Sequence, residues 1–404
     1  MISKVIGSFR LLTTNENALL LGQAVSMIGD FMALPAFVIL AARRHPAVLM
    51  LFFIVYFMPR CAQPFLGALV DRYDARRVAL VADAARTVIF VVLFLYPESY
   101  PSAPWLLAVF AASAFGALFE PARLKIMSAV AVDFVDYSKI FNVVNSSAGV
   151  ASLAFALLIE QYGRTEVIFI TNALTFAISF GFLTRVAYKQ SPATTDARGG
   201  FKQWIEGFML LKQHHAILYS SGLVILVDFF TGALYEEFPH KAAIVGFGAF
   251  GTYVYYFVVC LGNTVGALLI RPGLASTGRL GLLCAFGAAS VSVFIESDSL
   301  SLSIMSCLCF FSVQILAIVS SEIAIQRVIP AEYHGRVFAI NESLPYLALS
   351  LGGTVAGVLG LPAIFALCVC SFPLFYLLAR AALETDWYFR ALANDPQPHP
   401  RLQR

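Results

Sequence analysis

Residues Gly67–Arg77, Gly-Ala-Leu-Val-Asp-Arg-Tyr-Asp-Ala-Arg-Arg, place two acids and three arginines between two long apolar runs. These runs, Leu49–Val70 and Val78–Leu95, are each long enough to cross the hydrocarbon core of a bilayer as a helix. Charges at this density are costly in hydrocarbon, so the cluster must lie in water at the membrane surface. The stretch therefore predicts a short aqueous turn between two membrane-spanning helices.

The residue types in this turn suit a latch, meaning a contact that holds two parts of the protein together in one conformation. Gly67 has no Cβ, so it can let another helix backbone approach closely. Asp71 lies four residues further on the same helical face, and its carboxylate can point at the N-terminus of the helix that carries Glu342. Three arginines can pair with carboxylates: Arg72, Arg76 and Arg77. The simpler alternative is that these arginines only set the topology.

The order Gly-x-x-x-Asp-Arg-x-x-x-Arg-Arg resembles the signature between helices two and three of the major facilitator superfamily, Gly-x-x-x-Asp-Arg-x-Gly-Arg-Arg/Lys. Asp74 stands near the position where that family usually has glycine, and the basic pair lies one place later. The resemblance implies an all-α membrane protein with twelve transmembrane helices in two pseudo-symmetric six-helix bundles. It also implies a transporter and not an enzyme, so no catalytic residue is expected.

The composition agrees with a chain that lies largely in lipid. Hydrophobic residues make up 59% and charged residues 13% of the sequence, whereas about a quarter of the residues of an average soluble protein are charged. Hydropathy predicts twelve spans of about 20 residues. The expected spans are 17–42, 48–70, 78–96, 104–126, 139–159, 166–186, 217–237, 246–270, 280–296, 299–324, 337–359 and 362–382.

One long polar segment, 187–216, divides the spans into two sets of six. It contains Ser191-Pro192 and Gly199-Gly200, followed by the amphipathic stretch Phe201–Lys212, which suits a helix lying on the membrane surface. We therefore expect four parts: an N-terminal bundle at 1–186, a cytoplasmic linker at 187–216, a C-terminal bundle at 217–382 and a cytoplasmic tail at 383–404.

Lysine and arginine are distributed unevenly between the two sides of the predicted membrane. With the N-terminus inside, 21 of the 27 lie in interior segments and 4 in exterior ones. The positive-inside rule then predicts that both termini are cytoplasmic. We expect a monomeric multi-pass protein of the bacterial inner membrane whose partners are the lipid bilayer and a small-molecule substrate. Nucleic acid is not an expected partner, because the basic residues are spread over many loops.

The two halves show weak internal similarity, which parallel repeats in a transporter would explain. Short motifs recur at matching places in the two sets of spans. The pairs are Asp30-Phe-Met with Asp228-Phe-Phe, Glu120-Pro-Ala-Arg-Leu-Lys with Glu322-Ile-Ala-Ile-Gln-Arg, and Asn145-Ser-Ser with Asn341-Glu-Ser.

Two acids, Asp30 and Asp228, lie near the middle of predicted spans. A charge near a helix centre costs about 2.5–3.5 kcal/mol on insertion scales, so these acids are not expected to face lipid. Two interpretations remain open. Each acid is either a structural ion pair or a neutral hydrogen-bonded group, or it lines a central aqueous cavity and binds a proton or a cationic group of the substrate.

Arg60, directly after Pro59 in the second span, is the expected partner of Asp30. Proline removes a backbone donor and bends a helix, which could bring the guanidinium toward Asp30. We hypothesise that the pair forms in one conformation and separates in another, so that protonation of Asp30 releases Arg60. Coupling to a proton gradient requires that Asp30 bind its proton more tightly in one of these conformations than in the other.

Other polar residues lie within the spans. Glu120 precedes Arg123 by three residues and can pair with it, as either a gate or a structural lock. Asp83 and Arg86 have the same spacing, and we expect them to pair structurally. Isolated amides at depth are often only helix–helix contacts. The expected substrate-binding and proton-coupling residues are Asp30, Arg60, Glu120, Asn145, Asp228 and Gln314.

No cofactor or metal is expected. The sequence has no Gly-x-x-x-x-Gly-Lys-Ser/Thr motif for ATP, so a proton gradient is the expected energy source. The seven cysteines lie in apolar runs with no His or acid at ligand spacing, so neither a metal site nor a disulfide framework is expected.

Four further stretches resemble the branch of the superfamily that holds the enterobactin exporter and macrolide-efflux proteins. They are Ser26–Asp30, Pro59-Arg60, Asn142–Gly149 and Gly335–Phe338. This resemblance implies a secondary active transporter that exports a small molecule such as a siderophore or drug by alternating access and proton antiport. Because the fifth span lacks the Gly-Pro-rich antiporter motif, antiport follows from the branch and not from this helix.

Three alternatives remain. Phe119–Arg123 is also similar to lysophospholipid flippases, which move lipids laterally from the bilayer. A ferroportin-like divalent metal exporter would use Asp30, although no His or Cys lies nearby in the sequence. A receptor that transports nothing would not need acids inside its spans. Siderophore export predicts a polar cavity containing arginine, whereas lipid transport predicts a wide apolar cavity with lateral openings.

Overall fold

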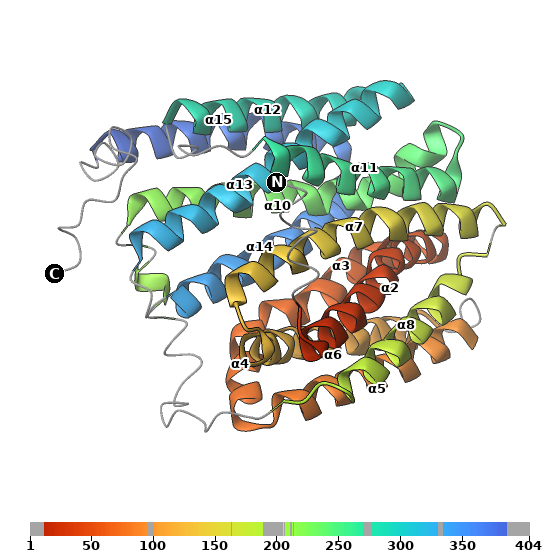
Figure 1. Ribbon diagram of the computed structural model, residues 1–404. Coiled ribbons are helices and arrows are strands. Elements are labelled where there is room, and N and C mark those ends of the chain that lie inside the picture. The colour runs from red at the N-terminus through yellow and green to blue at the C-terminus, as the bar shows by residue number, and fades with distance from the viewer. Residues whose placement is uncertain are drawn as a thin grey trace. The chain divides into compact units, whose positions relative to one another are not determined.

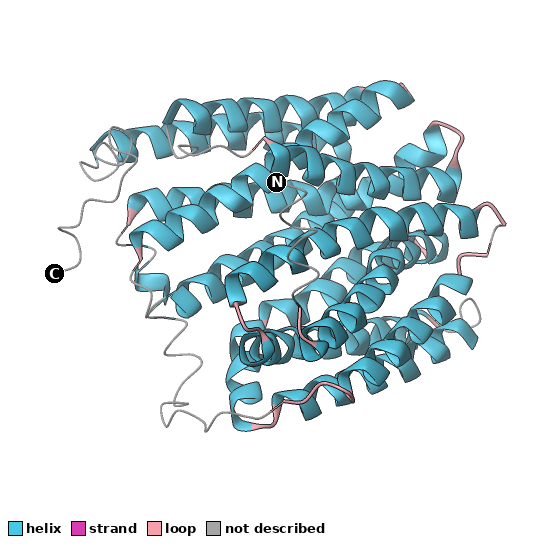
Figure 2. Ribbon diagram, in the orientation of Figure 1, coloured by secondary structure: helices cyan, strands magenta, loops and turns pink. Residues whose placement is uncertain are grey.

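The computed structural model describes residues 12–95, 101–188 except 163, 205–269 except 206, 211 and 213, 277–329, and 334–385. All regular elements in these ranges are helices (Figure 2), which confirms the all-α prediction. Thirteen described helices cover the twelve expected spans, because α3 and α4 share one. Much of the amphipathic stretch 201–212 and the tail from 386 lie outside the described residues.

Figure 1 shows the order of the helices along the chain. The helices of the first six spans are α2 (Thr14–Arg44), α3 (Pro46–Cys61), α4 (Gln63–Arg72), α5 (Ala75–Leu95), α6 (Ser102–Val130), α7 (Phe134–Glu160) and α8 (Val167–Leu183). The later helices are α10 (His215–Ile244), α11 (Gly248–Leu268), α12 (Thr277–Glu296), α13 (Leu300–Val328), α14 (His334–Leu359) and α15 (Leu361–Thr385).

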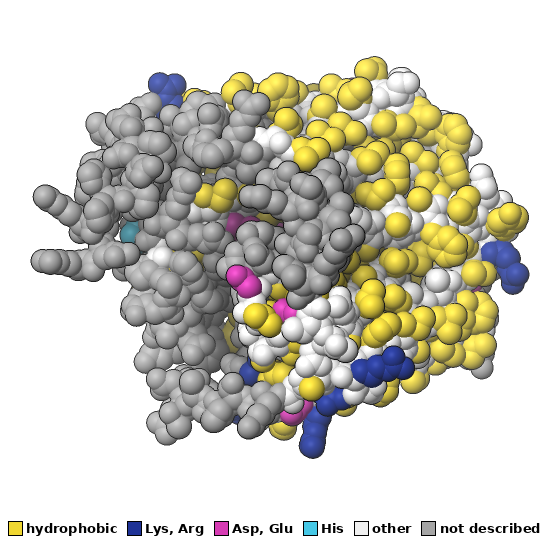
Figure 3. All heavy atoms as spheres, viewed as in Figure 1, with side chains coloured by type: hydrophobic (Ala, Val, Ile, Leu, Met, Phe, Trp, Pro, Cys, Tyr) yellow, Lys and Arg dark blue, Asp and Glu magenta, His cyan; other side chains and the backbone are white. Residues whose placement is uncertain are grey.

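The described helices carry many apolar side chains on their outer surfaces. Leu107 of α6 and Phe286 of α12 are exposed, as are many other large apolar residues, and Figure 3 shows apolar side chains over much of the visible face. Seven of the described helices are individually long and apolar enough to cross a membrane. Exposed apolar surface on this scale is unfavourable in water and suits contact with lipid.

The second expected span, 48–70, is wrong as a single helix, because the helix breaks at Ala62. The next proline, Pro64, has no N–H and cannot donate to the carbonyl of Arg60. The chain instead closes α3 with a tight bond from Ala62 N–H to the carbonyl of Pro59, at 3.1 Å. The break therefore falls three residues after Pro59, where the sequence predicted a bend.

The stretch 67–77 is mostly helical, and only Tyr73 and Asp74 connect α4 to α5. Asp74 Oδ1 accepts a hydrogen bond from the backbone N–H of Arg77 at 2.9 Å, which caps the start of α5. Arg76 Nε donates to the carbonyl of Leu183 at 3.0 Å, and its Nη2 donates to that of Thr184. The departure from glycine at Asp74 thus has a local structural reason.

The chain forms two compact units. The first comprises residues up to Phe201 together with Tyr235–Cys260, and the second comprises Lys202–Leu234 together with the residues from Leu261 onward. The boundary after Phe201 lies inside the expected linker. Tyr235–Cys260, which follows the linker in the sequence, belongs to the first unit.

In the first unit, α2 packs very closely on α8. A Cβ at Gly29 would lie 2.0 Å from Asn172 Oδ1 and 2.2 Å from Thr175 Oγ1. About two helical turns toward the N-terminus on the same face, a Cβ at Gly22 would lie 2.9 Å from Phe182 Cβ. Only glycine allows this approach, and it fixes the position of the next residue, Asp30.

In the second unit, α10 packs on α14 through glycines of both helices. A Cβ at Gly232 would lie 2.0 Å from the carbonyl oxygen of Leu349, and one at Gly352 would lie 1.8 Å from that of Phe229. Asn341 Oδ1 of α14 also accepts hydrogen bonds from two serines on neighbouring helices, Ser221 at 2.7 Å and Ser321 at 2.9 Å. Close backbone contact and shared hydrogen bonds are typical of helix packing inside a membrane.

Candidate functional site

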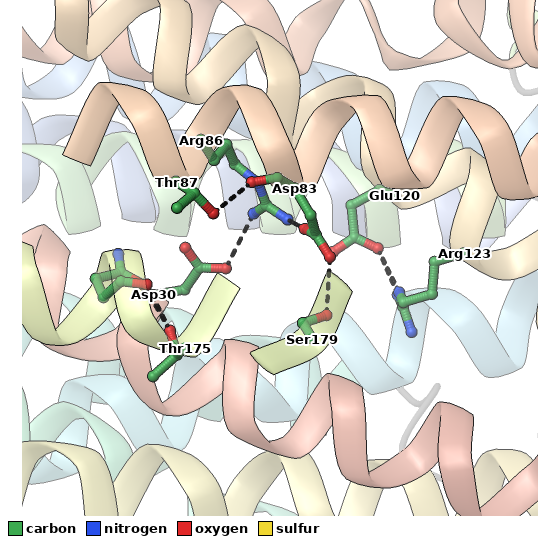
Figure 4. A network of polar contacts seen from close by, with 9 residues as sticks. Asp30, Asp83, Arg86, Thr87, Glu120, Arg123, Thr175 and Ser179 are labelled. Carbon is green, nitrogen blue, oxygen red and sulfur yellow. Dashed lines mark hydrogen bonds and ion pairs between the residues drawn. The ribbon is translucent and has the colours of Figure 1, made fainter. Parts of the chain in front are cut away.

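Arg86 of α5 joins two acids in the interior of the first unit (Figure 4). Its Nη2 lies 2.5 Å from Asp83 Oδ1 on the same helix, and its Nη1 lies 3.4 Å from Asp30 Oδ2 of α2. The expected Asp83–Arg86 pair is therefore confirmed. With two carboxylates for one guanidinium, the three ionised groups carry one excess negative charge.

Several contacts hold Arg86 in place. Its guanidinium lies 4.0 Å from the centroid of the Phe176 ring and 4.7 Å from that of Phe119, at distances suited to cation–π attraction. Asp83 accepts a second hydrogen bond, from Ser179 Oγ of α8 at 2.8 Å. Because Asp83 is completely buried, the Asp83–Arg86 pair is the fixed part of the site.

Asp30 is the accessible acid of this group. Its side chain is 44% exposed, whereas that of Arg86 is 5% exposed. Asp30 lies in the middle of α2, where a carboxylate that faced lipid would be costly. Its longer contact with Arg86 and its exposure make it the acid that can change partner or protonation state most readily.

The sequence predicted Arg60 as the partner of Asp30. In this conformation the ion pair of Asp30 is instead with Arg86. Arg60 lies at the end of α3 with its guanidinium 5.3 Å from the centroid of the Tyr56 ring. It interacts electrostatically with both Asp30 and Glu120. Arg86 is closer because α5 and α2 both pack against α8, which brings Arg86 and Asp30 together.

Glu120 forms the expected pair with Arg123 on α6. Arg123 Nε lies 2.9 Å from Glu120 Oε2, and its guanidinium lies 4.4 Å from the centroid of the Phe141 ring. The side chain of Glu120 is 42% exposed and that of Arg123 is 10% exposed.

In the second unit, Gln314 Nε2 of α13 donates a hydrogen bond to Asp228 Oδ1 of α10. The structure thus brings two predicted site residues together. Asp228 is only 6% exposed. In this conformation it matches the first interpretation drawn from the sequence, a buried hydrogen-bonded acid.

The expected latch residues lie in different settings. Among the described residues, a Cβ at Gly67 would meet Pro121 Cβ at 3.9 Å, an ordinary contact, so the close approach expected at Gly67 stays a prediction. Arg72, Arg77 and Glu342 are exposed, and the side chain of Asp71 lies outside the described residues. A latch between Asp71 and the helix of Glu342 would join the two units and stays a prediction. Asn145, the remaining predicted site residue, is half-buried on α7.

Sequence reasoning missed the residues that surround Arg86, namely Ser179 and the rings of Phe119 and Phe176. The spacing of Asp83 and Arg86 was the only local signal for this part of the site. Within the described ranges, no group of three or more His, Cys, Asp or Glu residues is arranged to hold a metal ion.

Comparison with known proteins identifies the family. Residues 19–353 match the Major Facilitator Superfamily, so the chain belongs to this family of transporters. It is 27% identical to a Bacillus subtilis protein, BacE, to which bacilysin export is provisionally assigned, over 89% of this chain and 92% of the relative. It is also 28% identical to YfiS, an uncharacterised transporter of the same superfamily from Bacillus subtilis, over 93% and 95% of the two chains.

Solved structures show the same fold. The nucleoside transporter NupG matches with a TM-score of 0.71 and 11% identity, over 93% of this chain and all of that chain. The human organic anion transporter MFSD10 matches with a TM-score of 0.63 and 13% identity, over 90% and 97% of the two chains. At these identities the likeness concerns the fold, and it agrees with twelve transmembrane helices.

Proposed function

We propose that the protein is a proton-coupled exporter of a small molecule in a bacterial inner membrane, with both termini cytoplasmic. It works as a monomer by alternating access, with the proton gradient as its energy source. Asp30 is the group whose protonation is coupled to transport. The observation that carries this proposal is the position of Asp30, half-exposed in the middle of α2. Its ion pair with Arg86 is long, at 3.4 Å, because Arg86 already pairs with Asp83 at 2.5 Å.

The charges around Arg86 support this role for Asp30. When Asp30 is ionised, Asp30, Asp83 and Arg86 together carry one negative charge. A proton on Asp30 removes this charge and leaves Asp83 and Arg86 as a neutral buried pair. Neither state leaves an arginine buried without an acid, which would be strongly unfavourable. Asp30 can therefore gain and lose a proton while the rest of the site keeps its structure.

The direction of transport rests on the relatives. BacE, which aligns with most of this chain, carries the name of an exporter. Siderophores and drugs are the substrate classes that the sequence motifs favour. We propose export for this chain on these grounds, and we expect an outward flux of substrate in exchange for protons.

Proton flux in proteoliposomes tests the proposal. The probes are a catecholate siderophore, a macrolide and a lysophospholipid, and a pH-sensitive dye inside the vesicles reports proton movement. We expect at least one probe to be transported together with a proton flux. Asp30→Asn should abolish gradient-driven transport and leave the thermal unfolding temperature nearly unchanged, because the isosteric amide still fills the site.

The control is Glu296→Gln, which changes an exposed acid at the end of α12. It should transport as the unaltered protein does. Unchanged gradient-driven transport in Asp30→Asn, or transport of a probe with no proton flux in the unaltered protein, would contradict proton coupling at Asp30.

A further inference from the structure

Helix α3 is firmly fixed in the first unit. Its Phe52 and Phe53 side chains are completely buried, and the Phe52 ring stacks on that of Tyr56 with 5.2 Å between the ring centroids. Ser113 Oγ of α6 donates a hydrogen bond to the carbonyl of Tyr56. Dense packing and a hydrogen bond from another helix both oppose a movement of α3.

Helix α4, which follows directly, packs much less on its surroundings. Of its side chains that the structure describes, only that of Val70 is buried, whereas Phe65 and Leu69 are exposed. Its polar contact with α6 is long, because Lys125 Nζ lies 3.4 Å from the carbonyl oxygen of Val70. A segment that buries little apolar surface against the protein can move at a low cost in free energy.

The backbone hydrogen-bond ladder is interrupted between these two helices. Pro64 has no N–H, so the carbonyl of Arg60 lacks the donor that a continuous helix would supply. The ladder starts again at Ala62, whose carbonyl accepts from the N–H groups of Phe65 at 2.9 Å and Leu66 at 3.0 Å. The two helices are therefore not one rigid rod across this point.

A second break separates α4 from α5. The backbone of Tyr73 is extended, with φ −112° and ψ 163°, and α5 begins two residues later at Ala75. Arg76 Nε donates to the carbonyl of Leu183 at the end of α8 at 3.0 Å, which fixes the start of α5. Helix α4 is thus a weakly packed segment between two fixed helices, with a break in the ladder at each end.

We propose that α4 is a hinged segment, which turns as one piece about Ala62 and Tyr73 during transport while α3 and α5 keep their places. Hinges are typically a few residues at the ends of helices that absorb a change in backbone angles. The last two residues of α4 are Asp71 and Arg72, so the turn moves these two charges. Because Arg86 lies on α5, its ion pairs keep their geometry during this movement.

Hydrogen–deuterium exchange of the full-length protein in lipid nanodiscs tests the proposal. The reference segment is Ala122–Met127 of α6, which lies beside α4 at the contact of Lys125 with Val70. We expect the amides of Phe65–Arg72 to exchange at least about tenfold faster than those of the reference segment, which corresponds to about 1.4 kcal/mol in opening free energy. Equally slow exchange in the two segments would overturn the proposal.

Proline variants assign the mobility to the break. The double variant Pro59→Ala/Pro64→Ala supplies two missing N–H groups and favours one continuous helix. We expect its exchange in Phe65–Arg72 to slow to the rate of the reference segment. Pro373→Ala, which changes an exposed proline inside α15, should leave exchange in α4 unchanged. Fast exchange that persists in the double variant, or equal slowing by Pro373→Ala, would contradict a hinge set by these prolines.

A transport measurement shows what the hinge does, and this part rests on the proposed function. The double variant should lose most of the substrate-dependent proton flux and keep the pH of half-maximal flux, because the site of Asp30 is intact. Unchanged flux in a variant whose α4 has become protected, or a shifted pH of half-maximal flux, would overturn the role of the hinge. No proton flux in the unaltered protein would remove proton coupling and leave the exchange result as it stands.

Discussion

Asp30 and Asp83 share one arginine, and their surroundings make them unequal. Asp83 is completely buried, lies 2.5 Å from Arg86 and accepts a hydrogen bond from Ser179. Asp30 is half-exposed and lies 3.4 Å from the same guanidinium. A buried carboxylate that has lost its cation is far more costly than an exposed one. Arg86 therefore neutralises mainly Asp83. Because Asp83 holds Arg86 at its distance from the accessible Asp30, Asp83 is a positioning residue for Asp30.

Asp83→Asn should leave Arg86 with Asp30 as its acid partner. The ionised form of Asp30 then becomes more stable, so we expect the pH profile of substrate-dependent proton flux to move toward lower pH. The unfolding free energy should fall by about 3 kcal/mol, at the low end of the cost of removing one partner of a buried pair. Proton flux in proteoliposomes across a pH series measures the first effect, and thermal unfolding measures the second.

Ser179→Ala removes only one hydrogen bond from Asp83 and leaves its charge in place, so it should lower the unfolding free energy by about 1 kcal/mol and move the pH profile much less than Asp83→Asn does. A purely structural role for Asp83 would lower stability and leave the pH profile in place. That outcome would contradict its effect on Asp30.

At the scale of helices, glycine on α2 sets the position of Asp30. The approach of α2 to α8 at Gly29 leaves no room for a Cβ, since Asn172 Oδ1 would lie 2.0 Å away. Gly67 on α4, which the sequence marked as a close-packing residue, has no described atom nearer to the position of a Cβ than Pro121 Cβ at 3.9 Å. The same residue type thus has different structural importance in the two helices.

Gly29→Ala and Gly67→Ala form a matched pair. We expect Gly29→Ala to destabilise the protein by about 1–3 kcal/mol, because the added methyl group overfills a closely packed site. Gly67→Ala should change stability by no more than about 0.5 kcal/mol. Thermal unfolding of both variants in the same detergent checks this, and equal effects would show that α2 and α8 can separate without cost.

At the scale of the whole molecule, internal similarity does not extend to the pairing of the acids. Asp30 in the first unit has an arginine as its partner, and Asp228 in the second unit has the amide of Gln314. Asp228 is also much more buried than Asp30. The two units therefore treat related acids differently, one as an accessible charge and the other as a buried hydrogen-bonding group.

Asp228→Asn should accordingly be milder than Asp30→Asn. The asparagine can still accept the hydrogen bond from Gln314, so we expect the unfolding free energy to change by less than about 1.5 kcal/mol. Gradient-driven transport should persist in Asp228→Asn and be lost in Asp30→Asn when both are measured in the same proteoliposome assay. Loss of transport in both variants would mean that Asp228 also takes part in coupling.

The amino-acid sequence alone determined the all-helical fold, the family and most helix positions. Apolar length and charge density are properties of each segment, and the bilayer imposes the helix on any apolar segment of sufficient length. The local pairs of Asp83 with Arg86 and Glu120 with Arg123 followed from helical spacing, because residues three apart lie on neighbouring parts of one helix face. The importance of Asp30 followed from the cost of a charge at its depth.

Only the tertiary structure decided which helices supply the partner of each acid. Asp30 pairs with Arg86 because both lie near α8, and no pattern in the sequence states how α2, α5 and α8 are rotated about their axes. The rotation of these helices and of α6 also decides that the carboxylates of Asp30 and Glu120 are accessible while Arg86 and Arg123 are buried. A sequence lists charges without their exposure, and exposure depends on packing between segments that are far apart in the chain.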